Sequence, residues 1–339
     1  MINIGIAGLG KMGKLHFLNS LKIKDVKINA IADLSRSRRK SAEKFGVKTY
    51  SDYKDMIDTE NIDAIIISLP NFLKKESVLY AIDKSIDVFL DKPLARNYDE
   101  AEEMVSRAND KNIRLMVGTN YRYFDSVQKL KSKIDDGNIG EVQLLTSELI
   151  MDGPFSHPLV PAPVADWWFD KNRSGGGALL DLGYHLLDLF VWMFGDYDVE
   201  YSLLKNRYNL PIEDSATLVL KSKMSDITGV INVGWFSKMV FPAFNFRCNA
   251  HGSVGYISTD KYAPRNPYLH AMKSGIDNLF RKLTGRNLNY LSYTYYYSSF
   301  VNILSLFFDC ITKGSEIESS LKDQLIIMKS IDDVYNKIG

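Results

Sequence analysis

Cysteine is scarce in this chain, and its scarcity excludes several kinds of site. Only two of the 339 residues are cysteines, Cys248 and Cys310, and both lie in apolar-patterned segments. A disulfide framework, or a zinc site built on Cys-X-X-Cys pairs, needs more cysteines at closer spacing. We therefore expect two buried, reduced thiols and no metal centre.

A long apolar run and an excess of one charge are also lacking. No uninterrupted apolar segment approaches the roughly 18 residues that span a membrane, and the first residues have the pattern of a strand and turn, not of a signal peptide. Lys plus Arg, 42 residues, nearly cancels Asp plus Glu, 41 residues. No overall field therefore favours nucleic acid or an acidic membrane. We expect a cytoplasmic protein that binds neither.

The composition is otherwise that of a globular protein, 45% hydrophobic and 24% charged. The length exceeds what one hydrophobic core usually supports, so two domains are expected. In the first part of the chain, short apolar runs alternate with helical patterns, which predicts a parallel doubly wound sheet. These runs lie at residues 2–8, 26–33, 62–69, 86–91 and 114–120.

The pattern changes after Tyr121. Longer apolar runs follow one another with polar breaks, which favours a large open, mostly antiparallel sheet. These runs lie at residues 141–151, 199–208, 215–222, 227–236 and 243–250. Helical patterns at 293–312 and 320–337 end the chain, and we expect them to pack back on the first domain. The basic and aromatic region 261–292 is compatible with a lid or an interface element.

A glycine loop follows the first predicted strand. Gly8, Gly10 and Gly13 form a Gly-X-Gly-X-X-Gly motif that also opens the first helix. In that setting the first glycine permits a tight turn, the second lets a pyrophosphate approach the backbone, and the third allows close packing of helix on strand. The amides at the helix start, which include Lys11 and Met12, would bind the phosphates. The motif predicts a dinucleotide site.

Asp33 ends the second predicted strand, where a carboxylate would bind the hydroxyls of an adenosine ribose. A 2′-phosphate at that position would be repelled, so the sequence favours NAD over NADP. Arg38 lies close enough in sequence to keep NADP open as an alternative.

Two further turns follow predicted strands, at the edge where a doubly wound sheet binds its ligands. Pro70 and Asn71 would form the floor beside the nicotinamide, unless they make an ordinary turn. Lys92 precedes Pro93, which restricts the lysine to extended geometry. An ammonium held there can contact the cofactor, bond a substrate hydroxyl and stabilise charge on its oxygen.

The apolar segment 175–195 carries three ionisable residues, Asp181, His185 and Asp188, at spacings of four and three. On a continuous helix they share one face. Buried carboxylates need partners or a cavity, and a carboxylate one turn from an imidazole can stabilise its charged form and hold its orientation. We interpret His185 as a proton acceptor assisted by Asp181. Asp188 is either part of the site or a structural partner of the helix.

Together these motifs resemble the glucose–fructose oxidoreductase / inositol dehydrogenase family of NAD(P)-dependent dehydrogenases. The similarity runs from GIAGLGKMG through SLPN, DKPL, NYRY and GGGALLDLGYHLLDL to GVINVGW and HGSVGYIS. It implies a Rossmann domain over residues 1–121 and a substrate-binding and oligomerisation α/β domain over residues 122–339, with a homodimer or homotetramer formed through its sheet.

The resemblance also assigns residues. The family's lysine would be Lys92, its helix aspartate and histidine would be Asp181 and His185, and Asn120 and Arg122 fall where substrate meets cofactor. The family usually has glutamate at the position of Asp91 and a histidine at the position of Lys74. Trp168 could stack on a sugar or belong to the core.

The resemblance implies hydride transfer between the nicotinamide of NAD(P) and a hydroxyl-bearing carbon of a sugar, cyclic polyol or nucleotide sugar. Two alternatives stay open. Some relatives oxidise a sugar transiently with bound NAD in order to cleave a glycosidic bond. A dinucleotide-binding sensor or assembly subunit would bind NAD without redox turnover, but a pure binder would not need Lys92, Asp181 and His185 together.

Overall fold

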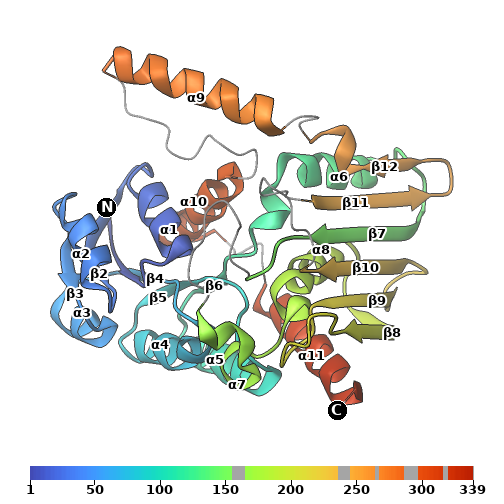
Figure 1. Ribbon diagram of the computed structural model, residues 1–339, viewed down its shortest axis with the longest axis horizontal. Helices are drawn as coiled ribbons and strands as arrows, with labels where there is room; N and C mark the ends of the chain where they lie inside the picture. Colours follow the sequence, from blue (N-terminus) through green and yellow to red (C-terminus); the bar gives the residue numbers. More distant parts are fainter. Residues whose placement is uncertain (155–164, 236–244, 264–266, 286–296, 316–319, 339) are drawn as a thin grey trace.

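The computed structural model describes residues 1–154, 165–235, 245–263, 267–285, 297–315 and 320–338. Its first half is a parallel six-stranded sheet in the order β3-β2-β1-β4-β5-β6 (Figure 1). The strands are β1 (Ile2–Ala7), β2 (Val26–Ala32), β3 (Lys48–Tyr50), β4 (Ala64–Ile67), β5 (Asp87–Leu90) and β6 (Leu115–Val117). The predicted doubly wound sheet is confirmed. The sequence missed only β3, because this short edge strand has no buried residue and so carries no apolar run.

Helices connect these strands and cover the sheet. They are α1 (Lys11–Ser20), α2 (Arg36–Glu43), α3 (Tyr53–Thr59), α4 (Asn71–Asp83) and α5 (Tyr98–Asp110). Because β1 and β4 are neighbours while β2 lies on the other side of β1, the strand order reverses beside β1. An open parallel sheet binds ligands at the carboxyl ends of its strands near such a reversal. The glycine loop after β1 and the turns after β4 and β5 therefore lie at the expected edge.

The second half contains a mixed sheet in the order β12-β11-β7-β10-β9-β8. Its strands are β7 (Val142–Ile150), β8 (Tyr197–Lys205), β9 (Ser215–Ser222), β10 (Thr228–Gly234), β11 (Asn245–Gly252) and β12 (Tyr256–Ser258). All neighbours are antiparallel except β7 and β10, so the prediction of a mostly antiparallel sheet is confirmed. Helices α6 (Asp125–Asp135), α8 (Tyr184–Phe194) and α11 (Leu321–Ile338) contact one face, and Figure 1 shows the other face open.

After the second sheet the chain returns to the first. Helix α10 (Tyr297–Lys313) places Ile303, Leu304 and Phe307 in the same apolar cluster as Ile4 and Ile6 of β1. Helix α11 contacts both α5 of the first half and α8 of the second. Burial of apolar surface is the main favourable term in such packing, so α10 and α11 tie the two sheets together.

The apolar segment 175–195 is not the continuous α-helix that the sequence predicts. A π-helical turn, η3 (Leu179–Gly183), precedes α8. The stretch Lys171–Phe194, which includes the short helix α7 (Lys171–Ser174), is long and apolar enough to cross a membrane, but 83% of its most apolar window is buried inside the protein. No other stretch among the described residues meets that test. Asp181 lies within this π turn, and such turns are frequent at functional sites.

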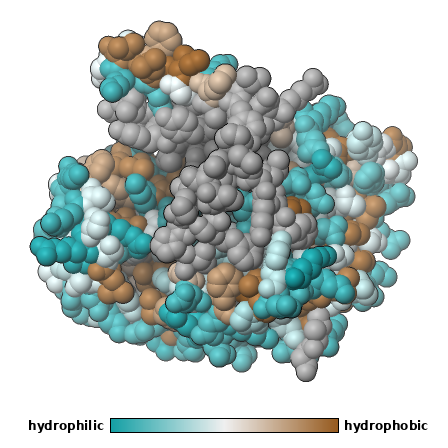
Figure 2. All heavy atoms as spheres, in the orientation of Figure 1, coloured by the Kyte–Doolittle hydropathy of each residue, from teal (hydrophilic) through white to brown (hydrophobic). Residues whose placement is uncertain are grey.

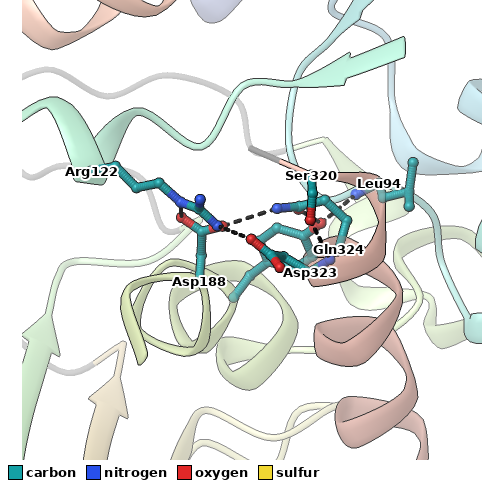
Figure 3. A network of polar contacts seen from close by, with 7 residues as sticks. Leu94, Arg122, Asp188, Ser320, Asp323 and Gln324 are labelled. Carbon is teal, nitrogen blue, oxygen red and sulfur yellow. Dashed lines mark hydrogen bonds and ion pairs between the residues drawn. The ribbon is translucent and has the colours of Figure 1, made fainter. Parts of the chain in front are cut away.

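A buried ion pair connects parts of the chain that are far apart in sequence (Figure 3). Arg122, in the short helix η1 (Asn120–Tyr123), donates from Nε and Nη2 to the two carboxylate oxygens of Asp188 in α8, both at 2.7 Å. Nη2 also reaches Asp323 of α11 at 3.2 Å, and Gln324 of α11 donates to Asp188 at 2.9 Å. Asp188 is thus the structural partner of its helix, which decides the alternative that the sequence leaves open.

Neither Arg122 nor Asp188 has any solvent-exposed side-chain surface. Burial by itself would lower the pKa of Arg122, but Asp188 and then Asp323 outweigh it and raise that pKa above its ordinary value. The guanidinium of Arg122 therefore stays charged, and its buried position depends on Asp188. Removing one partner of a buried pair leaves an uncompensated charge, which costs about 3–5 kcal/mol.

We expect Asp188→Ala to lower the free energy of unfolding by about 3–5 kcal/mol for that reason. A matched control is Asp198→Ala, since Asp198 is 63% exposed and pairs with Lys223 on the surface. That control should change stability by under about 1 kcal/mol. Urea denaturation followed by tryptophan fluorescence measures both. Equal effects of the two substitutions would show that the buried pair has no special structural weight.

Candidate active site

The glycine loop has the geometry that its motif predicts. Gly8 has a φ of +90°, and a Cβ there would lie 2.5 Å from the carbonyl oxygen of Ser68. A Cβ on Gly13 would lie 1.8 Å from the carbonyl oxygen of Gly8. Gly10 differs, because a Cβ there would meet nothing within 4 Å. Gly8 and Gly13 are therefore required by packing, whereas the space beside Gly10 is open to a ligand.

The start of α1 suits a phosphate group. Its N-cap, Gly10, has no side chain to bond the first amides, and the first turn carries no acidic residue. Lys11 is exposed and Met12 half-buried at that turn. Unpaired amides and the positive end of the helix dipole attract phosphate oxygens. The residues present thus fit the pyrophosphate of a dinucleotide.

Asp33 lies beside this loop, as the sequence predicts. Its two carboxylate oxygens accept hydrogen bonds from the amides of Leu9 and Ser35, each at 2.7 Å. Arg38 approaches the same carboxylate at 3.4 Å, and its side chain is 55% exposed. The two amide bonds fix the carboxylate at the end of β2, where a ribose hydroxyl can reach it.

An ion pair joins the two halves of the chain at the carboxyl edge of the first sheet. Lys92, just after β5, donates from Nζ to Oδ1 of Asp181 and to the backbone carbonyl of Asp181, both at 2.7 Å. The side chains are 23% and 18% exposed. An ammonium has three N–H donors, and two are used here. The third remains available to a ligand at this partly open position.

Asp181 is held by groups that the sequence did not identify. Trp235, at the end of β10, donates from Nε1 to Oδ2 of Asp181 at 3.1 Å. Glu213 accepts hydrogen bonds from the amides of Gly177 and Leu179 at 2.9–3.1 Å, at the entry to η3. A Cβ on Gly177 would lie 2.0 Å from the carbonyl oxygen of Glu213, so only glycine permits this approach. The motif GVINVGW in the sequence contains Trp235, so the first contact could have been anticipated. No motif in the sequence indicates the role of Glu213.

His185 lies one turn further along, in α8. Its ring stacks on Tyr121 with centroids 4.0 Å apart, and 7% of its surface is exposed. Nδ1 is buried without a hydrogen-bond partner among the described residues. Burial, and then the charge of Lys92, lower the pKa of His185 well below its ordinary value. The imidazole is therefore neutral at neutral pH.

This corrects one sequence prediction. Asp181 was expected to stabilise the charged form of His185 and to orient it. In the structure both carboxylate oxygens of Asp181 are engaged by Lys92 and Trp235, and the pKa of His185 moves down, not up. Asp181 lies in the π turn and His185 in α8, and the carboxylate of Asp181 is occupied by partners that follow β5 and β10. Asp181 positions the lysine instead of the imidazole.

A second buried group of charges lies behind Lys92. Lys74 of α4 is 1% exposed and donates from Nζ to the backbone carbonyls of Asp91 and Pro93, at 2.8 and 2.9 Å. His16 of α1 contacts Asp91 through Nε2 at 2.6 Å. Lys74 thus holds both sides of the Lys92–Pro93 turn. The sequence showed only that a lysine replaces the family's histidine, and a lone lysine in a helix gives no signal of burial.

The other expected site residues have varied surroundings. Asn71, at the start of α4, donates to the backbone carbonyl of Ser174 at 2.7 Å, next to Pro70. Asn120 donates to Ser299 of α10 at 2.9 Å. Trp168 is half-buried and meets Trp235 edge to face, with ring centroids 6.4 Å apart. It therefore lies next to the ring that bonds Asp181.

Arg122 does not take the place that the resemblance implies. It was expected to border the substrate, but its guanidinium has no exposed surface and is engaged by Asp188 and Asp323. A neighbouring polar residue in sequence cannot show whether its side chain points into a pocket or into the core. No group of three or more His, Cys, Asp or Glu residues positioned for a metal ion occurs in the described part of the chain.

The burial of Lys74 makes a pH-dependent prediction. Burial lowers the pKa of Lys74 to about 7, whereas it is about 10.4 in an unfolded chain. Between these values the unfolded chain binds one more proton than the folded one, so this residue makes the free energy of unfolding rise with pH by up to about 1.4 kcal/mol per unit. Lys74→Met should remove this slope.

Urea denaturation at several pH values between 6 and 9, compared as wild type minus variant, measures the slope. Lys84→Met is the matched control. Lys84 follows the last residue of α4, and it is exposed and paired with Asp58. The difference for Lys84→Met should stay level across this range. A level difference for Lys74→Met as well would contradict a buried lysine with a depressed pKa.

Comparison with known proteins identifies two family domains in this chain. A family model described as an oxidoreductase family with an NAD-binding Rossmann fold matches residues 2–119, and a GFO/IDH/MocA C-terminal domain matches residues 127–258. A myo-inositol 2-dehydrogenase of Thermotoga maritima is 29% identical over 268 residues, covering 76% of this chain and 75% of its own. A glucose-6-phosphate 3-dehydrogenase of Bacillus subtilis is 26% identical over 287 residues, covering 82% and 79%.

Solved structures show the same fold. The scyllo-inositol dehydrogenase of Lactobacillus casei, with bound NAD(H) and scyllo-inositol, superposes with a TM-score of 0.78 at 20% identity, covering 100% of this chain and 98% of its own. GenD2 from gentamicin A biosynthesis, in complex with NAD, superposes with a TM-score of 0.81 at 16% identity, covering 99% and 93%. With both family domains present in order over most of its length, this chain belongs to the Gfo/Idh/MocA family of NAD-binding oxidoreductases.

Proposed function

We propose that the protein is an NAD-dependent dehydrogenase that oxidises a secondary hydroxyl of a sugar, cyclic polyol or nucleotide sugar. One observation carries the proposal. An ammonium with one free donor, Lys92, and a buried neutral imidazole, His185, lie together at the ligand-binding edge of a Rossmann sheet. Oxidation of a hydroxyl requires a group that binds its oxygen and a group that takes its proton, and these two side chains supply both.

NAD is the cofactor that the residues favour. Two amides hold the Asp33 carboxylate at the end of β2, where it would accept the ribose hydroxyls and repel a 2′-phosphate. Arg38 pairs with that carboxylate, but its side chain is 55% exposed and could turn toward a 2′-phosphate. NADP is therefore the less favoured alternative. Gly8, Gly10 and the start of α1 would hold the pyrophosphate, with Pro70 and Asn71 bordering the nicotinamide. When bound, the nicotinamide accepts a hydride at C4.

Lys92 would bind the oxygen of the reacting hydroxyl. Its two bonds to Asp181 fix the ammonium, so no reorganisation is needed as negative charge develops on that oxygen. Trp235 bonds Asp181 in turn, and Glu213 holds the start of the turn that carries it, so both position the lysine indirectly. Asp181 therefore acts on the reaction by positioning Lys92.

His185 would accept the hydroxyl proton. Since burial and Lys92 depress its pKa, the imidazole is in the base form throughout the neutral range. Its stacking on Tyr121 fixes the plane of the ring. The accepting atom would be Nε2, because Nδ1 is enclosed by protein. A base of low pKa releases the proton readily afterwards, so the same group can serve the reverse reduction.

Three features support a polyhydroxylated ring as substrate. Trp168 offers an indole beside Trp235 on which a sugar ring can stack. The free donor of Lys92 can bond a hydroxyl. Relatives named for myo-inositol and glucose 6-phosphate are 26–29% identical to this chain.

The open face of the second sheet supports assembly of copies of the chain through that sheet. Tyr201 and Leu203 on this face are 53% and 37% exposed.

The two glycines of the cofactor loop should separate packing from binding. Gly10→Ala should leave stability unchanged, because a Cβ there meets nothing within 4 Å, but it should weaken NAD binding by about tenfold or more by filling the pyrophosphate space. Gly13→Ala should lower the unfolding free energy by at least about 1–3 kcal/mol through overpacking. Thermal unfolding and NAD titration calorimetry give both values. Unaltered NAD affinity in Gly10→Ala would exclude the glycine loop as the binding site of the pyrophosphate.

Removing the proposed base should abolish turnover and spare cofactor binding. His185→Ala should lower kcat for NAD-dependent polyol oxidation by about 10²–10⁴, with an NAD affinity close to that of the wild type. NADH absorbance with a panel of inositols, aldoses and nucleotide sugars measures turnover. The control is His251→Ala, an exposed histidine in β11. Wild-type turnover in His185→Ala would exclude the proposed base, and sugar release without NADH would indicate glycoside cleavage instead.

A further inference from the structure

Helix α9 (Pro267–Leu283) exposes an apolar face that the proposed reaction does not use. Met272, Ile276, Leu279, Phe280 and Leu283 are 54–74% exposed. These residues recur at intervals of three and four, so they form one stripe along the helix. Figure 2 shows this stripe as a brown patch at the top of the molecule, and Figure 1 shows α9 at the periphery, outside both sheets.

The opposite side of α9 faces the protein. Asn278 is 7% exposed and Gly275 is half-buried. Arg281 lies near Lys22, just after α1, where burial and then this guanidinium lower the pKa of the lysine. On this side of the helix Asn278 is thus buried, whereas the apolar residues of the stripe are more than half exposed and face outward. That is the reverse of a helix that serves the core.

The charges of α9 are arranged around the apolar stripe. At about 100° per residue, Lys273 and Lys282 lie about 80–100° to either side of the stripe's centre. Both lysines are exposed, and neither has an ion-pair partner among the described residues. The helix's only acid, Asp277, is paired with Arg281 at 2.7 Å. Two free cations therefore flank the exposed apolar face.

We propose that α9 docks the protein on the surface of an anionic lipid bilayer. An amphipathic helix with apolar residues on one side, cations at the flanks and little net hydrophobicity lies in the plane of the membrane interface. Long lysine side chains at the flanks reach the headgroups while the apolar stripe enters the acyl region. Only the helix face enters the bilayer, so this surface needs no membrane-spanning helix, and among the described residues the one stretch apolar enough to span a membrane is mostly buried.

The charges favour lipid over a second copy of the chain. Two α9 helices packed stripe to stripe would gather four free lysines around one apolar seam. The single carboxylate of each helix would offer no relief, since it already pairs with Arg281. Like charges around a seam oppose association, whereas phosphate headgroups neutralise them. The sequence had suggested no membrane partner because net charge over the whole chain hides this local arrangement.

Flotation of the full-length protein with vesicles tests the proposal. It should float with vesicles of phosphatidylcholine and phosphatidylglycerol, and several-fold less with phosphatidylcholine alone. High salt should reduce the bound fraction, because it screens the lysine contribution. Failure to float with the anionic vesicles at low salt would overturn the proposal.

Variants identify the surface. Leu279→Glu should weaken binding by about tenfold or more, since one large apolar side chain no longer enters the bilayer. Lys273→Glu combined with Lys282→Glu should lower the affinity for the phosphatidylglycerol vesicles by about fivefold or more per residue. The preference for anionic vesicles should then be lost. Met224→Glu, at a 78% exposed residue between β9 and β10, is the matched control and should float like the wild type. Melting temperature and NAD affinity should stay unchanged in all of them.

Two results would overturn the assignment. Leu279→Glu that floats as well as Met224→Glu would exclude α9 as the docking surface. A wild-type oligomer that Leu279→Glu dissociates in light scattering, with no flotation of either form, would show that a second copy covers the stripe. Both measurements are independent of dehydrogenase turnover, so they stand whether or not the proposed reaction is found.

Discussion

The site depends on one interaction, the ion pair between Lys92 and Asp181. It joins the carboxyl end of β5 to the π turn before α8, and it uses two of the lysine's three donors. Each partner is fixed from behind: Lys74 holds the turn around Lys92, while Glu213 and Trp235 hold the segment that carries Asp181. The free donor therefore has a defined direction before any ligand arrives, which is the condition for electrostatic stabilisation without reorganisation.

A second ion pair keeps these supports in register. Arg122 and Asp188 bind each other without access to solvent, and Asp323 and Gln324 of α11 complete the network. Asp188 and His185 both belong to α8 and lie about one turn apart, so fixing the helix at Asp188 also fixes the imidazole. The two carboxylates of the segment 175–195 thus have separate tasks: Asp181 directs a lysine at the site, and Asp188 anchors the helix.

Much of the fold and part of the site could be predicted from local pattern. Alternating apolar runs predicted every strand of the first sheet except β3, whose exposed residues carry no such pattern. The glycine spacing and Asp33 predicted the loop geometry, because both are required by backbone contacts within a short stretch. The role of Arg122 was wrong, since Asp188 and Asp323 reach it only after folding brings together residues far apart in the chain. Lys74 was noticed as a substitution, yet its burial has no signature in the sequence.

The sequence by itself determined the nucleotide-binding half, the candidate lysine and histidine, and the class of protein, since these rest on motifs whose physical requirements are local. Only the tertiary structure decided what each charge contacts. Asp181, in the π turn, contacts Lys92, and burial beside that lysine keeps His185 neutral. Packing likewise leaves the apolar stripe of α9 facing outward, although the same stripe could have served a core. Electrostatic partners and exposed faces depend on distances between segments, and the order of residues does not contain those distances.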